Sequence, residues 1–310
     1  MQTFLVTGAT RGLGLAIAGE LARRPDTRVV LAVRDLARGT ALAAGLGPRV
    51  EARALDLASL ADVRRFAAAW DRPLAGLVNN AGLQQMKGLT RTPDGLEETV
   101  AVNHLAAFAL TEGLLPWLTG GRVLFIGSGT HDPGHPVATF FGFRGARFTS
   151  IEALARGDTD APSARQAGMD RYATSKFLDT ITAREWARRI PPERTAFLCL
   201  DPGMMPGTGL ARGQPWPLRA AWNSLLHLVA LALPDASTPT RSARTAAWLL
   251  TEPGVEALSG TCFSYHRKPS TYVWSRVAEP ALGAEVFEQT RAFLARTAPA
   301  AGAAPRAEPA

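Results

Sequence analysis

The stretch TGATRGLG, Thr7–Gly14, joins an apolar run at residues 3–7 to a helical pattern that starts at its last glycine. Gly8, Gly12 and Gly14 let the backbone turn tightly and come close to a ligand. The N-terminus of the following helix presents unpaired N–H groups and the positive end of its dipole. At the first strand–helix junction, such a triplet predicts a loop that binds a pyrophosphate. The alternative interpretation is a glycine-rich turn without a ligand.

The rest of the chain alternates apolar runs with helical patterns. Ser59 has the position of an N-cap, and residues 94–118 read as one long helix. Continuous apolar strands between helices predict a parallel sheet that is covered on both faces. We therefore expect an α/β fold of the Rossmann type, a doubly wound parallel sheet of about seven strands in a single domain over residues 1–297. The predicted strands are residues 3–7, 28–33, 49–56, 74–82, 122–128, 195–203 and 260–266.

Two segments interrupt this alternation, at residues 129–169 and 204–239. Both follow the carboxyl ends of strands, where open α/β sheets bind their ligands. The first contains ATFFGFRGARF (138–148), and the second contains Met204, Met205, Trp216 and Trp222. We interpret them as the walls of a large apolar substrate pocket. The alternative is that one or both form the interface of a homo-oligomer.

Composition limits the class of protein. The formal net charge is +7, but the basic residues are dispersed, so we expect no nucleic-acid partner. Cys199 and Cys262 have no partners at metal-ligand spacing, and we expect no metal. No secretory signal pattern opens the chain, which favours a cytoplasmic location. Residues 220–234 are too short and too interrupted to span a bilayer, so we read them as a buried or lid helix, with an interfacial membrane helix as the alternative. The Ala/Pro-rich end, residues 298–310, is predicted to be disordered.

Five further motifs follow the glycine loop along the chain. They are NNAG (Asn79–Gly82), Asn103 in AVNHLAAF, Ser128 at the end of the fifth strand, YATSK with Tyr172 and Lys176, and DPG (Asp201–Gly203). Together with the spacing G-x-x-x-G-x-G, they resemble the short-chain dehydrogenase/reductase family over about residues 1–205. SGTHDP (128–133), DPGMMPGTGL (201–210) and LSGTCFSYH (258–266) are similar to the branch that contains retinol dehydrogenases and protochlorophyllide reductase.

Tyr172 and Lys176 are four residues apart, so on a helix they share one face. The lysine charge, together with the positive ring of an oxidised nicotinamide, favours the phenolate and is expected to lower the pKa of Tyr172. Such a tyrosine can protonate a carbonyl oxygen during reduction or deprotonate an alcohol in reverse, while Ser128 hydrogen-bonds the same oxygen. The resemblance further implies that Lys176 holds the nicotinamide ribose and that Asn103 supports a water relay. The predicted catalytic residues are Asn103, Ser128, Tyr172 and Lys176.

The residues at the end of the second strand indicate which of the two nicotinamide cofactors the chain prefers. An acidic residue there would favour NAD(H), but the position holds Val33, followed by Arg34. Arg11 supplies a second guanidinium, and two arginines suit a 2′-phosphate, so we expect NADP(H) rather than NAD(H). We interpret Asp35 as the N-cap of the next helix. The predicted cofactor-binding residues are Gly8, Thr10, Arg11, Gly12, Leu13, Gly14, Arg34, Asp56, Leu57, Asn80, Ala81, Gly82, Tyr172, Lys176, Pro202 and Gly203.

These features predict an NADP(H)-dependent oxidoreductase that interconverts a bulky or lipophilic ketone or aldehyde and its alcohol. One alternative is a reductase of C=C bonds in enones, since the same tyrosine and lysine can protonate an enolate. Another is a non-catalytic NADP-binding regulator or scaffold. His104 and His131 lie next to site residues in the sequence, and we read both as structural histidines.

Overall fold

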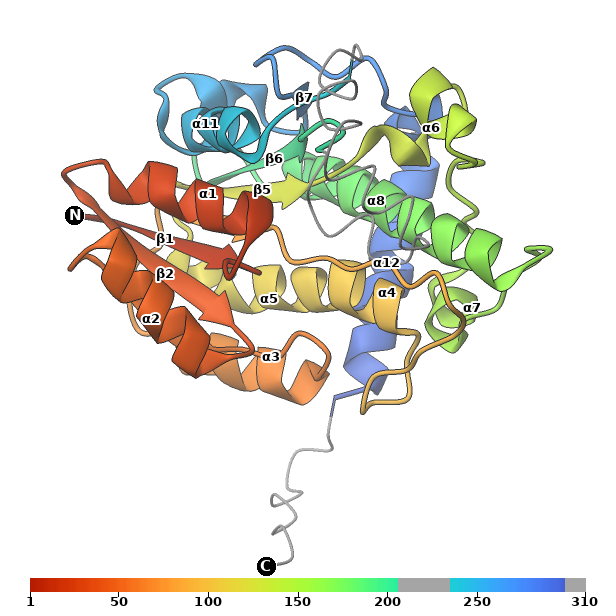
Figure 1. Ribbon diagram of the computed structural model, residues 1–310, viewed down its shortest axis with the longest axis horizontal. Helices are drawn as coiled ribbons and strands as arrows, with labels where there is room; N and C mark the ends of the chain where they lie inside the picture. The colour runs from red at the N-terminus through yellow and green to blue at the C-terminus, as the bar shows by residue number, and fades with distance from the viewer. Residues whose placement is uncertain (206–234, 299–310) are drawn as a thin grey trace, which may run out of the picture.

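The computed structural model describes residues 1–205 and 235–298 (Figure 1). Seven parallel strands form one sheet in the order β3-β2-β1-β4-β5-β6-β7, which confirms the predicted doubly wound α/β fold. The strand order reverses between β1 and β4, and the crevice at such a point is where open sheets bind dinucleotides. The strands are β1 (Gln2–Thr7), β2 (Thr27–Val33), β3 (Val50–Ala54), β4 (Gly76–Asn79), β5 (Gly121–Ile126), β6 (Thr195–Asp201) and β7 (Cys262–Ser264).

Helices cover the sheet on both faces (Figure 1). On β1, Phe4 and Val6 join the core of one face and Leu5 joins the core of the other. Because successive side chains of a strand point to opposite faces, a strand buried on both sides must be apolar throughout. One face carries α1 (Gly12–Ala22), α2 (Leu36–Leu46) and α11 (Pro239–Thr251), and the other carries α3 (Leu60–Ala68), α5 (Ala106–Leu114), α8 (Ala164–Arg189) and α12 (Pro280–Arg296).

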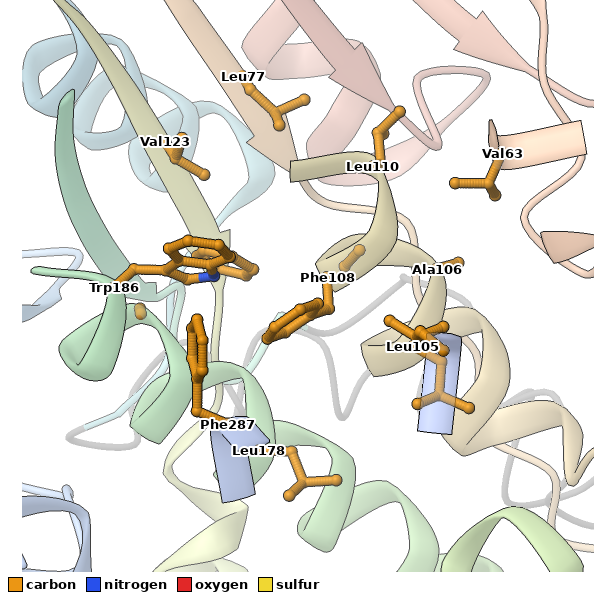
Figure 2. Close-up of a cluster of buried hydrophobic side chains, with 14 of the residues drawn as sticks. Val63, Leu77, Leu105, Ala106, Phe108, Leu110, Val123, Leu178, Trp186 and Phe287 are labelled. Carbon is orange, nitrogen blue, oxygen red and sulfur yellow. The ribbon is translucent and has the colours of Figure 1, made fainter. Parts of the chain in front are cut away.

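Three aromatic rings lie at the centre of the larger core, between the sheet and helices α5, α8 and α12 (Figure 2). The Phe108 ring lies 5.4 Å from that of Trp186 and 5.0 Å from that of Phe287. The Trp186 and Phe287 rings are 4.6 Å apart at 79°, an edge-on contact. Burial of each such side chain contributes about 2–3 kcal/mol. This cluster fixes α8, the helix that carries Tyr172 and Lys176, against the sheet.

The long helix predicted over residues 94–118 has a different start and a different interior. It begins with α4 (Glu98–Val100), because the Glu97 side chain accepts hydrogen bonds from the N–H groups of Thr99 and Val100. Asp94 instead accepts a hydrogen bond from Leu60 at the start of α3. A π-helix, η1 (Ala101–Leu105), then interrupts the α-helical pattern before α5, and a 3₁₀ turn, η2 (Leu115–Trp117), ends the segment. Asn103 therefore lies in a π-helical turn.

The segment at residues 129–169 contains structure of its own. It forms the 3₁₀ turn η3 (Gly129–His131) and two short helices, α6 (Pro136–Phe140) and α7 (Ile151–Arg156), before α8 begins. Of the segment at residues 204–239, only Met204, Met205 and residues 235–239 are described. The predictions for Trp216, Trp222, residues 220–234 and the tail beyond residue 298 lie outside the described residues. Within residues 1–205 and 235–298, no helix has the length and apolar character needed to cross a membrane.

Candidate active site

The glycine loop forms a tight cradle at the end of β1. Gly8 has a φ of +65°, a backbone conformation that favours glycine. A Cβ atom on Gly14 would lie 2.6 Å from the carbonyl oxygen of Gly8. No side chain among the described residues caps the N-terminus of α1, so its first N–H groups are available to an anion. The cradle therefore fits the pyrophosphate of a dinucleotide.

Hydrogen bonds join the NNAG segment after β4 to this loop. The Thr7 hydroxyl oxygen accepts hydrogen bonds from the backbone N–H groups of Asn80 and Ala81, both at 3.0 Å. The Asn80 side-chain amide donates in return to the carbonyl oxygen of Thr7 at 2.9 Å. The carboxyl ends of β1 and β4 are therefore held together at the crevice where the strand order reverses.

A single cavity of about 1720 Å³ runs along this edge of the sheet. The glycine loop forms part of its lining, and Ser128, Tyr172 and Lys176 form another part. Every predicted catalytic and cofactor-binding residue lines this cavity except Asn103. Residues from Gly8 to Gly203 are thus gathered around one space that is large enough for a dinucleotide and a second ligand.

Tyr172 and Ser128 both line the cavity, and their side chains are close enough to interact. Burial raises the pKa of Tyr172 above its usual value, although the Lys176 charge and the interaction with Ser128 act to lower it. Asp201 and Asp179 add to the increase in this pKa. The effect of Lys176 has the expected sign, but burial outweighs the lysine charge, so Lys176 by itself does not lower the pKa of Tyr172 below its usual value. The expected contribution of an oxidised nicotinamide stays a prediction.

Lys176 is 4% exposed and is anchored on two sides. Its ammonium donates to the carbonyl oxygen of Ile126 at 2.7 Å and to Asp179 Oδ2 at 3.0 Å. Burial acts to lower the pKa of Lys176, but the nearby Asp179 and Tyr172 raise it above its usual value. Lys176 is therefore held as a cation beside Tyr172.

Asn103 does not line the cavity but lies behind Leu83, which does. Its Oδ1 accepts a hydrogen bond from the N–H of Leu83 at 2.8 Å, and its Nδ2 donates to the Leu83 carbonyl at 3.0 Å and to Ser175 Oγ at 2.9 Å. The side chain thus joins the segment after β4 to α8. Both of its N–H groups are used in these bonds, so the predicted water relay through Asn103 stays a prediction.

Arginine side chains surround the end of β2. Arg11 and Arg34 line the cavity, as predicted for a 2′-phosphate site. Asp35 accepts a hydrogen bond from the backbone N–H of Arg38 at 2.9 Å and caps α2, which confirms its predicted role. Arg38 also lines the cavity, and this third arginine was missed. Its position in the first turn of α2, directly after the end of β2, is the signal that could have found it.

Aromatic side chains from the first interrupting segment reach the cavity, as expected. Phe140, Phe141 and Phe143 line it, and the Phe143 ring lies 6.3 Å from the Tyr172 ring. Phe148 does not line it, because it packs against Phe177 at the edge of the core. The segment after β7, from Ser264 to Tyr272, also contributes lining residues that sequence reasoning missed, although it too follows the carboxyl end of a parallel strand.

The two histidines next to site residues do not line the cavity. His131 is buried, and its burial lowers its pKa to about 4. His104 is buried as well, and its Nε2 is hydrogen-bonded to Thr290 Oγ1 at 3.0 Å. Over the described ranges, no cluster of His, Cys, Asp and Glu side chains could hold a metal ion.

Comparison with known proteins agrees with this geometry. Residues 2–142 match the family model described as short chain dehydrogenase. The chain is 34% identical to "Dehydrogenase/reductase SDR family member 13" of Bos taurus, over 85% of this chain and 66% of the relative. The chain therefore spans about two thirds of the length of that relative.

Two other relatives match over more of their own length. Retinol dehydrogenase 14 of Mus musculus is 32% identical over 84% of this chain and 77% of the relative. A protein of Streptomyces sp. (strain C5) named "Putative daunorubicin C-13 ketoreductase DnrU" is 32% identical over 96% of this chain and 94% of the relative. The second alignment includes nearly the whole of both chains.

Proposed function

The chain belongs to the short-chain dehydrogenase/reductase family of NAD(P)-dependent oxidoreductases, in its retinol dehydrogenase-like branch, and from this membership we propose that it is an NADP(H)-dependent enzyme. Its proposed reaction interconverts a bulky or lipophilic ketone or aldehyde and the corresponding alcohol. The observation that carries this proposal is the convergence of Ser128, Tyr172 and Lys176 on the cavity that the glycine loop also lines.

The chemistry follows from these side chains. A nicotinamide cofactor, when bound, supplies or accepts the hydride. During reduction Tyr172 donates its hydroxyl proton to the carbonyl oxygen, and during oxidation its phenolate removes the proton of the alcohol. Ser128 hydrogen-bonds the same oxygen and orients it. The Lys176 ammonium stabilises the phenolate form of Tyr172.

The lining supports a large apolar substrate. Phe140, Phe141, Phe143, Met169 and Met205 contribute aromatic and thioether surface to the cavity. The names of two relatives, a retinol dehydrogenase and a daunorubicin ketoreductase, refer to large molecules with extensive apolar parts. We therefore propose that residues 129–169 form the substrate side of the site.

The purified chain should oxidise NADPH when it is given a bulky aromatic ketone or a long-chain aldehyde, with the alcohol identified as product by mass spectrometry. An α,β-unsaturated ketone in the same panel separates C=O from C=C reduction. A saturated ketone as the product from that substrate would contradict the proposed reaction. Lack of turnover across the panel would favour the regulator or scaffold instead.

Replacing Arg34 with Ala is expected to raise the KM for NADPH about 10- to 100-fold and to leave the KM for NADH nearly unchanged. A hydrogen bond to a charged group contributes about 1.5–3 kcal/mol, and each 1.4 kcal/mol is a factor of about ten. Arg23→Ala is the matched control, because Arg23 lies near the other end of α1 in an exposed ion pair with Glu20. An equal increase in the KM for NADPH and for NADH would contradict a contact between Arg34 and the 2′-phosphate.

The direction of the Tyr172 pKa shift predicts opposite pH dependences for the two directions of the reaction. Alcohol oxidation needs the phenolate, so its kcat should rise with pH and level off only above the raised pKa of Tyr172. Carbonyl reduction needs the phenol, so its kcat should fall over the same alkaline range. Initial rates in both directions from neutral to alkaline pH test this, and an oxidation rate that does not increase with pH would be contrary to it.

A further inference from the structure

A buried carboxylate stands behind the lysine of the proposed site. Asp179 lies on α8, three residues after Lys176, and is 2% exposed. Its Oδ2 accepts a hydrogen bond from the Lys176 ammonium. With the bond to Ile126, two of the three N–H groups of Lys176 are bound by the protein, which leaves one for a ligand in the cavity. Asp179 therefore restricts both the position of Lys176 and the effect of its charge.

The second oxygen of Asp179 faces a histidine. Asp179 Oδ1 accepts no hydrogen bond from any described residue and lies 3.7 Å from His104 Nδ1. The Thr290 hydroxyl donates its only proton to the carbonyl oxygen of Val286, so it must accept a hydrogen bond from His104 Nε2. In that assignment Nδ1 of the neutral ring carries a lone pair on the side that faces the carboxylate. Thr290 thus orients the His104 ring toward Asp179 from helix α12.

We propose that Asp179 is a positioning residue that holds Lys176 against β5 and offsets its positive charge beside Tyr172. The inference rests on the proposed function, because it concerns the same tyrosine. An isolated lysine would present a full charge to the tyrosine, whereas the Lys176–Asp179 pair is neutral overall.

Several groups face Tyr172 from different elements. Lys176 and Asp179 come from α8, Ser128 follows β5, and Asp201 ends β6. Lys176 lowers the pKa of Tyr172, and both aspartates raise it. Cys199 on β6, like Asp179, raises the pKa of Lys176. Removing the charge of Asp179 alone should therefore lower the pKa of Tyr172.

Asp179→Asn is the sharpest variant. The side-chain oxygen of asparagine can still accept from Lys176, and its amide can donate to His104 Nδ1, so the geometry is retained while the charge is lost. The chain contains three tyrosines, so NMR of the full chain labelled at the tyrosine Cζ gives three signals, and Tyr172→Phe assigns that of Tyr172. We expect its titration midpoint to fall by about one pH unit in Asp179→Asn.

The control is Glu185→Gln. Glu185 is a buried acid of the same helix, but it binds Arg188 and Arg189 rather than Lys176. This variant should leave the Tyr172 midpoint unchanged. The pH profile of alcohol oxidation should move to lower pH in Asp179→Asn and stay in place in Glu185→Gln. Loss of structure would also lower the midpoint, because it exposes the Tyr172 phenol, so the shift counts only in an Asp179→Asn protein that circular dichroism shows to be folded.

An unchanged Tyr172 midpoint in a folded Asp179→Asn protein would overturn the inference. Asp179→Ser is made in parallel, because it removes the same charge without placing an amide against His104. If both variants fail to fold while Glu185→Gln folds, the pair is a stabilising contact only and the inference is wrong. Because the NMR midpoint requires no turnover, a shifted midpoint without any carbonyl reduction would overturn the proposed function and leave the role of Asp179 in place.

Discussion

Replacing Tyr172 with Phe is expected to lower kcat for carbonyl reduction about a thousandfold, within the range of about 10²–10⁴ that a positioned general acid contributes. The phenylalanine ring keeps the contact with Phe143 but lacks the hydroxyl that interacts with Ser128. Cofactor binding, measured by calorimetry with NADPH, should be retained, because the glycine loop is unaltered.

Tyr272→Phe serves as the control for this loss. Tyr272 also lines the cavity, and its ring stacks on His135 at 3.9 Å, a contact that phenylalanine can keep. We expect this variant to retain most of the activity. If both variants lost activity equally, the effect would lie in the packing of the cavity and not in proton transfer. Full activity in Tyr172→Phe would remove Tyr172 from the reaction altogether.

Gly14→Ala is expected to have the largest effect on cofactor binding. The added Cβ would lie 2.4 Å from Asn80 Nδ2 and 2.6 Å from the carbonyl oxygen of Gly8. Since one of these atoms belongs to the backbone of the cradle, the loop has to move. Overpacking of this kind lowers the free energy of unfolding by about 1–3 kcal/mol. Each 1.4 kcal/mol of binding free energy lost when the loop moves lowers the affinity for NADPH about tenfold. We expect a loss of at least this size.

Gly19→Ala on the same helix is the matched control. A Cβ there would lie 3.6 Å from Leu46 Cδ2, an ordinary van der Waals contact. Alanine in a helix interior is favoured over glycine by about 0.5–1 kcal/mol, so this variant should be slightly more stable and should bind NADPH normally. Thermal unfolding and calorimetry measure both properties. Normal NADPH binding by Gly14→Ala would show that the loop does not hold the pyrophosphate.

Local patterns were sufficient to predict the sheet, and together with the family resemblance they identified many of the residues around the cavity. Strands that are buried on both faces have continuous apolar sequences, so all seven could be located. Tyr172 and Lys176 could be placed on one helix face from their spacing alone. Caps were also readable, since Asp35 and Ser59 accept the hydrogen bonds expected of N-cap side chains.

The features that could not be predicted from the sequence depend on contacts between residues that are distant in the chain. The pKa of Tyr172 is set by how deeply the surrounding segments bury it, which no motif states. Arg38 reaches the cavity because α2 turns its side chain toward Thr10. Asp94 does not cap the helix that follows it, because it accepts a hydrogen bond from Leu60 at the N-terminus of α3. None of these contacts lies within one period of a helix or strand.

The π-helical turn at residues 101–105 shifts the phase of a single long helix. In a regular α-helix each residue advances the face by about 100°, so one extra residue in a turn rotates everything downstream relative to everything upstream. Asn103 can then reach Leu83 and Ser175 while Phe108, five residues later, still points into the aromatic core. Deleting one residue here would restore regular helix geometry. The segment could then keep either the Phe108 contacts in the core or the Asn103 hydrogen bonds to Leu83 and Ser175, but not both.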